Sequence, residues 1–144
     1  MRSPDLPQIF VHNCQRKILL DRSALQDFAC RALLLCAQEK GTGLTNLHEV
    51  HVILISDRRM SALHRRFMQI AGPTDVITFD HGEIFISVET ARRQARSYKT
   101  SLGHELRLYL VHGLLHLRGF DDATLAARRR MERVQERIVR QASS

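Results

Sequence analysis

The chain has 144 residues, which fits one compact domain and leaves little room for a second. With 44% hydrophobic and 26% charged residues, its composition argues against a disordered, collagen-like or coiled-coil protein. The longest unbroken apolar run covers only residues 32–37, whereas a membrane span needs about 20 residues. No secretory signal is visible at the N-terminus, and the three cysteines form no CxxC pair. We therefore expect a single domain over residues 1–144, located in the cytoplasm without a membrane contact.

The charge balance points to a class of partner. The chain has 22 Lys and Arg residues against 15 Asp and Glu residues, a formal net charge of +7. Such an excess favours polyanions, because each phosphate contact releases condensed counterions. The alternative is a solvated basic surface that only aids solubility. We favour RNA or another nucleic acid as the reason for the charge.

Hydrophobic periodicity divides the chain into alternating strands and helices. In the first half of the chain we expect a strand at 8–13, a helix from Asp21 or Ser23 to about 40, a strand at 49–56 and a short helix at 57–67. Two strands at 74–79 and 83–88 follow and are joined in a hairpin. The rest of the chain is expected to form a basic helix that ends near 98, a helix at 104–117 closed by Gly119, and a last helix at 125–140. This order predicts an α/β fold: a single-domain helix–sheet sandwich with a mixed sheet of about four strands.

Residues 112–122, which read HGLLHLRGFDD, contain the strongest chemical signal. His112 and His116 are four residues apart, so a helix presents both imidazoles on one face. Gly119 can adopt a positive φ and turn the chain back, which brings Asp122 toward the same point. Two imidazoles and a carboxylate are acceptable zinc ligands and leave one position open, as in catalytic sites. The alternative for two such histidines alone is a pair of half-buried polar residues.

The same spacing also occurs in metzincin-type peptidases, whose pattern is HExxHxxGxxH or ends in Asp. Those enzymes need a glutamate after the first histidine as general base, and this chain has Gly113 there. A small metallopeptidase is therefore the less favoured interpretation.

The stretch also resembles the signature of the YbeY family of bacterial endoribonucleases, HGxLHLxGYDH, and matches it through Asp121 with Phe120 in place of Tyr. Residues 73–79 (PTDVITF) resemble the family's PTDVLSF strand, and residues 82–87 (GEIFIS) resemble its GDIxIS strand. The resemblance extends over about residues 50–140. Together these motifs are specific, whereas each alone would be weak.

The resemblance implies a metal-dependent, single-strand-specific endoribonuclease. It implies action in 16S rRNA 3′-end maturation and in ribosome quality control, with the 16S rRNA precursor and the small ribosomal subunit as partners. It implies one divalent ion, for which zinc is the preferred candidate. This ion activates water and is held by His112, His116 and Asp122. The residues expected to act in catalysis are His112, His116 and Arg118.

The chain departs from the family pattern at two places. The third ligand is a histidine in the family, and this chain has Asp122 there. Family members usually have a Tyr-Arg pair before the PTDV strand, and alignment on Pro73 puts Phe67 and Met68 at that pair. The nearest arginines that could replace the missing one, or could only form a solvated helix face, are Arg65, Arg66 and Arg118.

These departures have a predictable chemical effect. Replacing a neutral imidazole by a carboxylate lowers the formal charge of a zinc site from +2 to +1, so bound water becomes less acidic. Loss of an arginine removes a stabilising donor for charge that develops on the phosphate. We expect a weak nuclease or one with a shifted pH optimum. A catalytically weak or inactive ribosome-assembly factor that binds rRNA is the alternative from another class.

Two further groups of residues have open roles in the sequence. Glu105 lies seven residues before His112, where it could orient a ligand or form a surface ion pair. Arg92, Arg93 and Arg96 could contact the RNA backbone or form a solvated face. The sequence leaves the native metal, the RNA cleavage site and the oligomeric state open.

Overall fold

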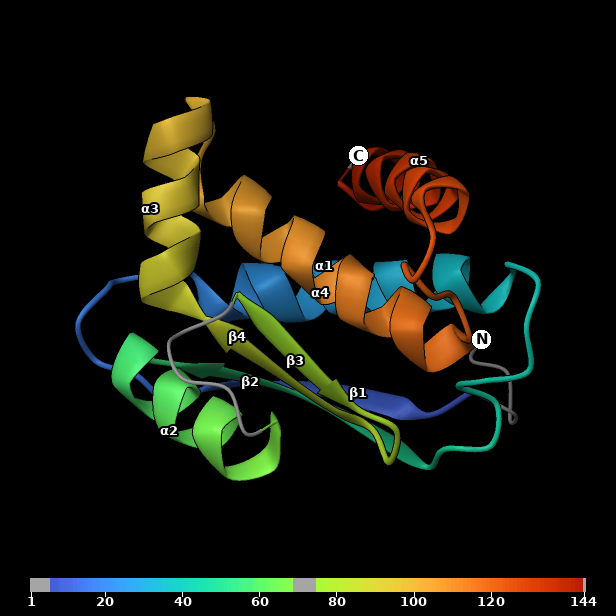
Figure 1. The fold of residues 1–144 in the computed structure, drawn as a ribbon, viewed down its shortest axis with the longest axis horizontal. Coiled ribbons are helices and arrows are strands. Elements are labelled where there is room, and N and C mark those ends of the chain that lie inside the picture. Colours follow the sequence, from blue (N-terminus) through green and yellow to red (C-terminus); the bar gives the residue numbers. More distant parts are fainter. Residues whose placement is uncertain (1–5, 69–74, 144) are drawn as a thin grey trace.

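The computed structural model describes residues 6–68 and 75–143 (Figure 1). Its four strands are β1 (Gln8–Asn13), β2 (Glu49–Ile55), β3 (Val76–Phe79) and β4 (Glu83–Ser87). They form one sheet in the order β1-β2-β4-β3, in which β1, β2 and β4 are parallel and β3 runs antiparallel to β4. The mixed four-stranded sheet and the hairpin of β3 and β4 confirm the predicted fold class.

Five helices lie in the described part of the chain. They are α1 (Arg22–Ala37), α2 (Asp57–Met68), α3 (Val88–Tyr98), α4 (Leu102–Arg118) and α5 (Leu125–Ala142). Helices α1 and α4 pack side by side on one face of the sheet, and α5 lies across them on the outside (Figure 1). Helix α2 lies on the opposite face. No helix among the described residues has the length and apolar character to cross a membrane.

Side-chain caps fix the beginnings of four helices. Asp21, Ser87, Ser101 and Thr124 each accept a hydrogen bond from a backbone N–H of the following first turn, which satisfies a donor without an intrahelical partner. For this reason α4 begins at Leu102, two residues before the predicted start. Residue 74, the predicted start of the strand at 74–79, lies outside the described residues.

Successive side chains along each strand point to opposite faces of the sheet, and so form two separate hydrophobic clusters. On one face, Val52, Leu54, Ile84 and Ile86 are fully buried and join α1, α4 and α5 in the main core. On the other face, Ile55 and Ile77 pack with Met60 of α2 in a smaller cluster. The main core holds α4 against the sheet, so α4 is a rigid support for side chains on its remaining face.

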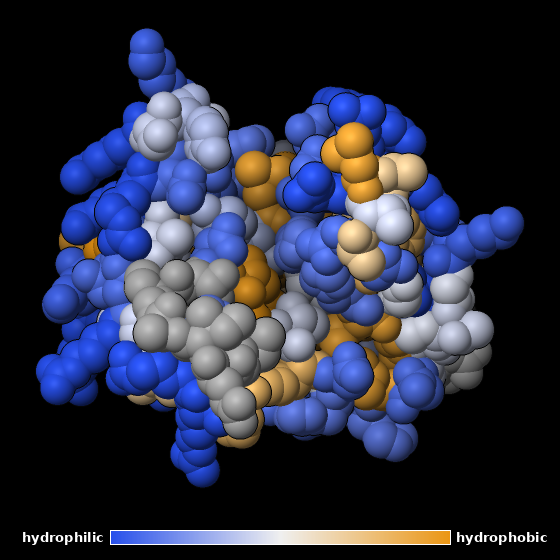
Figure 2. Space-filling view, viewed as in Figure 1, coloured by the Kyte–Doolittle hydropathy of each residue, from blue (hydrophilic) through white to orange (hydrophobic). Residues whose placement is uncertain are grey.

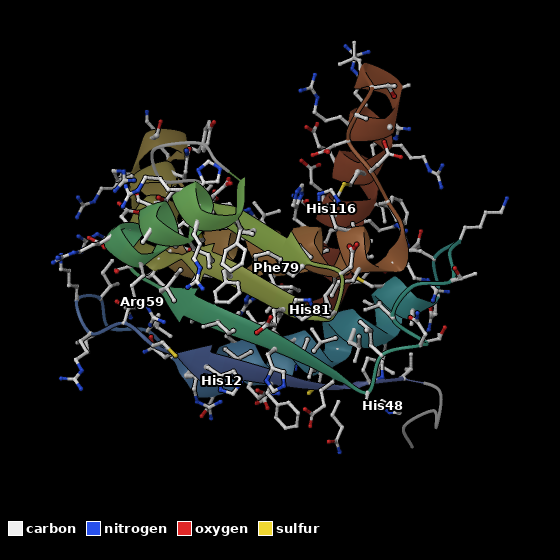
Figure 3. The ribbon with its side chains drawn as sticks, turned by 60° about the horizontal axis from the view of Figure 1, so that its bottom comes forward. His12, His48, Arg59, Phe79, His81 and His116 are labelled. Carbon is white, nitrogen blue, oxygen red and sulfur yellow. The ribbon has the colours of Figure 1, made fainter. Side chains whose placement is uncertain are left out.

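Helix α2 leaves part of its face of the sheet open. His12, Phe79 and His81 lie on this face (Figure 3). His12 is hydrogen-bonded to His51, with Nε2 and Nδ1 2.8 Å apart, and the two rings stack. On this open face, His12 and His51 thus provide each other's hydrogen-bond and stacking partner.

A carboxylate on α2 links this helix to α3. Asp57 accepts hydrogen bonds from the hydroxyls of Ser87 and Thr90, and from Nη1 of Arg93 at 2.6 Å. Burial opposes ionisation of Asp57, but these hydrogen bonds outweigh burial and hold the pKa of its carboxyl below the ordinary value. Arg93 is thus part of this ion pair, whereas a contact with the RNA backbone was one of two expectations for it.

This pKa shift predicts how stability depends on pH. Because the folded-state pKa of Asp57 is lowered, its contribution is present above the unfolded value of about 3.9 and is lost as the pH falls through the folded value. We expect Asp57→Asn to lower the free energy of unfolding by about 1–2 kcal/mol at pH 7 and by less below about pH 4. Urea denaturation at pH 7 and at pH 3 measures the difference in unfolding free energy between wild type and variant at each pH, with the exposed Asp27→Asn as control. A difference of the same size at both pH values would contradict the lowered pKa of Asp57 as its cause.

Candidate metal centre

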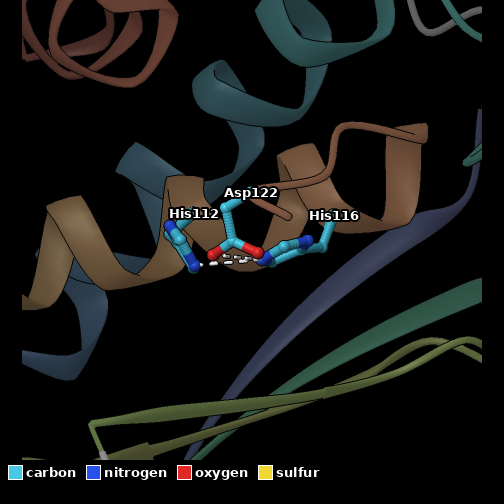
Figure 4. A group of neighbouring side chains, drawn as sticks. All are labelled: His112, His116 and Asp122. Carbon is cyan, nitrogen blue, oxygen red and sulfur yellow. Dashed lines mark hydrogen bonds and ion pairs between the residues drawn. The ribbon is translucent and has the colours of Figure 1, made fainter. Parts of the chain in front are cut away.

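The end of α4 brings three potential ligands together (Figure 4). His112 and His116 are one turn apart on α4, whose opposite side is anchored by buried leucines. Gly119 ends the helix with φ 120°, and its N–H bonds back to the carbonyls of Leu115 and His116. This left-handed turn reverses the chain and places Asp122 over the two rings. The sequence predicted this convergence.

The distances fit a mononuclear metal site. The ligand atoms of His112, His116 and Asp122 all lie within 4.8 Å of one another. The two Nε2 atoms are 3.0 Å apart, and Nε2 of His116 is 3.9 Å from Oδ2 of Asp122. With bonds of about 2.0–2.2 Å, tetrahedral zinc separates neighbouring ligand atoms by about 3.3 Å. The observed spacings lie on both sides of this value.

Hydrogen bonds behind the rings determine which nitrogens are free. Nδ1 of His116 is 3.1 Å from the carbonyl oxygen of Phe120, and Nδ1 of His112 is 2.9 Å from Oε1 of Gln135 on α5. Carbonyl oxygens only accept hydrogen bonds, so each Nδ1 carries the proton and donates it. Each Nε2 then presents a lone pair, and the two lone pairs point at the same place. A cation between them removes this repulsion, so the donor set fits a metal ion.

The protonation state of His112 also suits a ligand. Burial, and next the neighbouring imidazole of His116, lower the pKa of His112 below its ordinary value, although Gln135 and Asp122 act in the other direction. His112 is therefore neutral at neutral pH, and neutral imidazole is the form that binds metals.

A cleft of about 410 Å³ opens beside the two histidines. It lies between α4 and the edge strand β3, with α2 at its other side. Its lining residues are His64, Val76, Ile77, Thr78, Asp80, His112, His116 and Phe120. Most of this face of the molecule is hydrophilic, and hydrophobic side chains are visible between hydrophilic flanks (Figure 2). A substrate can thus reach His112 and His116 from solvent through this cleft.

Gly113 has a packing role that explains the absence of a glutamate there. A Cβ at Gly113 would lie 2.6 Å from Cγ2 of Ile84, so α4 approaches β4 as closely as it does only without a side chain. The side chain of residue 113 would point at the sheet instead of at the metal centre. The structure therefore provides no general base of the metzincin type at this position.

The structure does not bring Arg118 to the metal centre. Its side chain is buried, its Nε donates to the carbonyl of Glu39 at 3.0 Å, and its Nη1 donates to the carbonyl of Gly43 at 2.7 Å. Two residues along a helix correspond to a rotation of about 200°, so Arg118 points away from the face that carries His116. Arg118 holds the loop after α1 against the end of α4, a structural role different from the expected catalytic one.

We expect Arg118→Ala to lower the free energy of unfolding by about 2 kcal/mol, because two carbonyl groups lose a charged donor. Metal affinity of the folded protein should stay within about twofold of wild type, since additive effects are the rule for groups without shared partners. Thermal unfolding and a metal titration measure the two quantities, with the exposed Arg16→Ala as the charge-matched control. A loss of RNA cleavage without a loss of stability would restore the catalytic assignment.

The structure also shows the surroundings of Glu105 and of the residues at the position of the family's Tyr-Arg pair. Glu105 is buried near the beginning of α4, where its Oε2 accepts from the hydroxyl of Thr100 at 2.7 Å, so it forms neither of the two expected contacts. At the place of the family's Tyr-Arg pair, Phe67 contacts Phe79 edge to face and Arg66 lies over the Phe67 ring. The side chain of Met68 lies outside the described residues.

Sequence reasoning missed Gln135 and His64. Gln135 borders the apolar face of α5, and only the packing of α5 on α4 brings it to His112. His64 reaches the cleft from α2, on the other side of the sheet from α4. Neither residue stands at a spacing that links it to the motif in the sequence.

Known proteins that are similar to this chain share one family name. The model of the family "Endoribonuclease YbeY" matches residues 10–143. Among curated relatives named Endoribonuclease YbeY, a protein of Thermus thermophilus is 39% identical over 121 residues, which cover 76% of this chain and 85% of that protein. The protein of Pelotomaculum thermopropionicum is 32% identical over 148 residues, covering 91% and 94%. The relative from Anaeromyxobacter sp. Fw109-5 is 38% identical over 102 residues, and the match spans only 53% of its length.

A solved structure shows the same fold. The solution structure of TM1509 from Thermotoga maritima matches with a TM-score of 0.66 and 24% sequence identity, covering 94% of this chain and 89% of that chain. The family model extends over nearly the whole sequence, and these two relatives are 39% and 32% identical to the chain. The chain belongs to the endoribonuclease YbeY family.

Proposed function

We propose that this protein is a metal-dependent endoribonuclease that hydrolyses single-stranded RNA, with its metal held by His112, His116 and Asp122. The observation that carries the proposal is the pair of Nε2 atoms 3.0 Å apart, with a carboxylate oxygen of Asp122 3.9 Å from one of them and an open cleft beside them. The family name supplies the reaction class and the RNA substrate.

The chain's own residues have distinct tasks in this proposal. Gln135 and the Phe120 carbonyl hold the protons on Nδ1 of the two rings and thereby keep each Nε2 free for the ion. When bound, a divalent ion supplies Lewis-acid chemistry: it activates water and stabilises negative charge on a phosphate oxygen. Zinc is the proposed ion, because the ligand set of two imidazoles and one carboxylate occurs at catalytic zinc sites.

We further propose the 16S rRNA precursor as substrate, in 3′-end maturation and ribosome quality control in the cytoplasm. The net charge of +7 supports a large polyanionic partner. Exposed arginines of α5 provide cationic groups for backbone contacts; they are Arg128, Arg129 and Arg133.

The test is cleavage of an end-labelled RNA that contains single- and double-stranded segments. We expect metal-loaded protein to cut the single-stranded segment, and chelator or His116→Ala to stop the cleavage. His104→Ala serves as control, because His104 is an exposed histidine on the same helix. Cleavage that persists in chelator and in His116→Ala would contradict the proposal.

One observation favours a second candidate function. No arginine or lysine is among the described residues that line the cleft, and its one carboxylate, Asp80, is exposed. A phosphate in this cleft therefore lacks a cationic side chain that stabilises developing charge, a contact worth about 10²–10³ in rate. A catalytically weak or inactive assembly factor would bind rRNA equally well before and after His116→Ala, without metal-dependent cleavage.

A further inference from the structure

A threonine in the wall of the cleft has an unsatisfied hydroxyl. Oγ1 of Thr78 is the one buried side-chain oxygen or nitrogen among the described residues that has no hydrogen-bond partner. A buried hydroxyl without a partner loses its hydrogen bonds to water and gains none in return, so native proteins rarely contain one. The group therefore indicates a partner that arrives from outside the chain.

The position of Thr78 shows where such a partner lies. Thr78 is paired with Ile84 across the β3–β4 hairpin, and directly opposite residues of an antiparallel pair point to the same face. Ile84 packs directly under Gly113 of α4, the residue after the ligand His112. Thr78 thus faces α4 and lines the same cleft as His112 and His116.

The chemistry of a hydroxyl narrows the class of partner. Thr78 can donate one hydrogen bond, and the other polar side chains of the cleft, those of Asp80 and the histidines, do not accept it. A phosphodiester has two non-bridging oxygens, which are strong acceptors. When one of them faces the His112–His116 pair, the other is free to face strand β3 on the opposite wall of the cleft.

We propose that the hydroxyl of Thr78 donates a hydrogen bond to a non-bridging oxygen of the scissile phosphate, and so positions it; this inference rests on the proposed function. Oγ1 is closed off from solvent, so the contact forms when χ1 turns to another staggered position that brings the hydroxyl to the cleft. The hydrogen bond to the phosphate satisfies the hydroxyl and so favours this turn in the complex. Thr78 provides a neutral donor in a cleft whose described lining has no arginine or lysine.

The chain offers a matched pair of variants for the test. Thr78→Val keeps the shape and the β-branch but removes the hydroxyl, whereas Thr78→Ser keeps the hydroxyl. We expect kcat/KM for single-stranded RNA to fall about tenfold in Thr78→Val and to stay within about threefold of wild type in Thr78→Ser. Without metal, fluorescence anisotropy of a short single-stranded RNA should show the same order of affinities.

Stability separates this role from a structural one. Removal of an unpaired buried hydroxyl is neutral or stabilising, so the unfolding temperature of Thr78→Val should equal or exceed that of wild type. A lower unfolding temperature would reveal a structural partner such as a trapped water and would overturn the proposal. Equal kcat/KM and RNA affinity in wild type and Thr78→Val would overturn it while leaving the proposed function intact. A wild-type protein that binds this RNA but cleaves none would overturn the proposed function and the role of Thr78 with it.

Discussion

His116→Ala is expected to weaken metal binding by more than about a hundredfold. Residues that only orient a ligand typically contribute ten- to a hundredfold in affinity, and His116 supplies a ligand atom itself. Its loss removes the Nε2 atom that lies 3.0 Å from Nε2 of His112 and 3.9 Å from Oδ2 of Asp122. Metal content after purification without added metal, and titration against a competing chelator, measure the change. His104→Ala, an exposed histidine on the same helix, should retain wild-type affinity.

Two further variants test the rest of the metal centre. We expect Asp122→Ala to weaken metal binding, and Gln135→Leu to weaken it about ten- to a hundredfold, because the Nδ1 proton of His112 loses its acceptor. Metal that stays stoichiometric in Asp122→Ala would move the third ligand elsewhere. Metal that stays bound in His116→Ala would contradict the site as a whole.

The same alanine substitution at two glycines of α4 should have opposite effects. A Cβ at Gly113 would lie 2.6 Å from the Ile84 side chain, whereas a Cβ at Gly103 would meet nothing within 4 Å. Overpacking a core costs about 1–3 kcal/mol, so Gly113→Ala should destabilise the protein despite the better helix propensity of alanine. Gly103→Ala should stabilise it by about 0.5–1 kcal/mol.

Urea denaturation of both variants measures this difference. Because α4 also carries the ligands, a shift of the helix away from β4 in Gly113→Ala should weaken metal binding as well, whereas Gly103→Ala should leave it unchanged. Adding Ile84→Val to Gly113→Ala removes a methyl group beside the new side chain and should restore part of the loss. Stabilisation by Gly113→Ala would show that the helix is not held at the sheet by this contact.

Most of the fold could be predicted from local sequence patterns. Alternating hydrophobic residues marked the buried strands near 8–13 and 49–56, and Asp21 was one of two candidate caps for the first helix. The short turn at 80–82 marked the hairpin of β3 and β4. These signals depend only on residues that are close to one another in the chain, so they can be recognised in the sequence.

The three side chains that converge at the end of α4 could also be found from the sequence, because their geometry is local. A four-residue spacing on a helix and a glycine turn bring His112, His116 and Asp122 together without any long-range contact. Arg118 lies between two of these ligands in the sequence, but helix rotation turns it to the loop after α1. Proximity along the chain was therefore a poor guide to its role.

Tertiary packing alone decided what surrounds the ligands. The bond from Gln135 to His112 joins helices α5 and α4 across 23 residues, and the cleft needs α2, β3 and α4 to meet. Whether the Thr78 hydroxyl is paired depends on which atoms of distant elements come within hydrogen-bonding distance. The sequence by itself determined the fold class, the ligand motif and the family. The tertiary structure decided the hydrogen-bond partners, because these depend on the contacts between elements and not on the pattern within one.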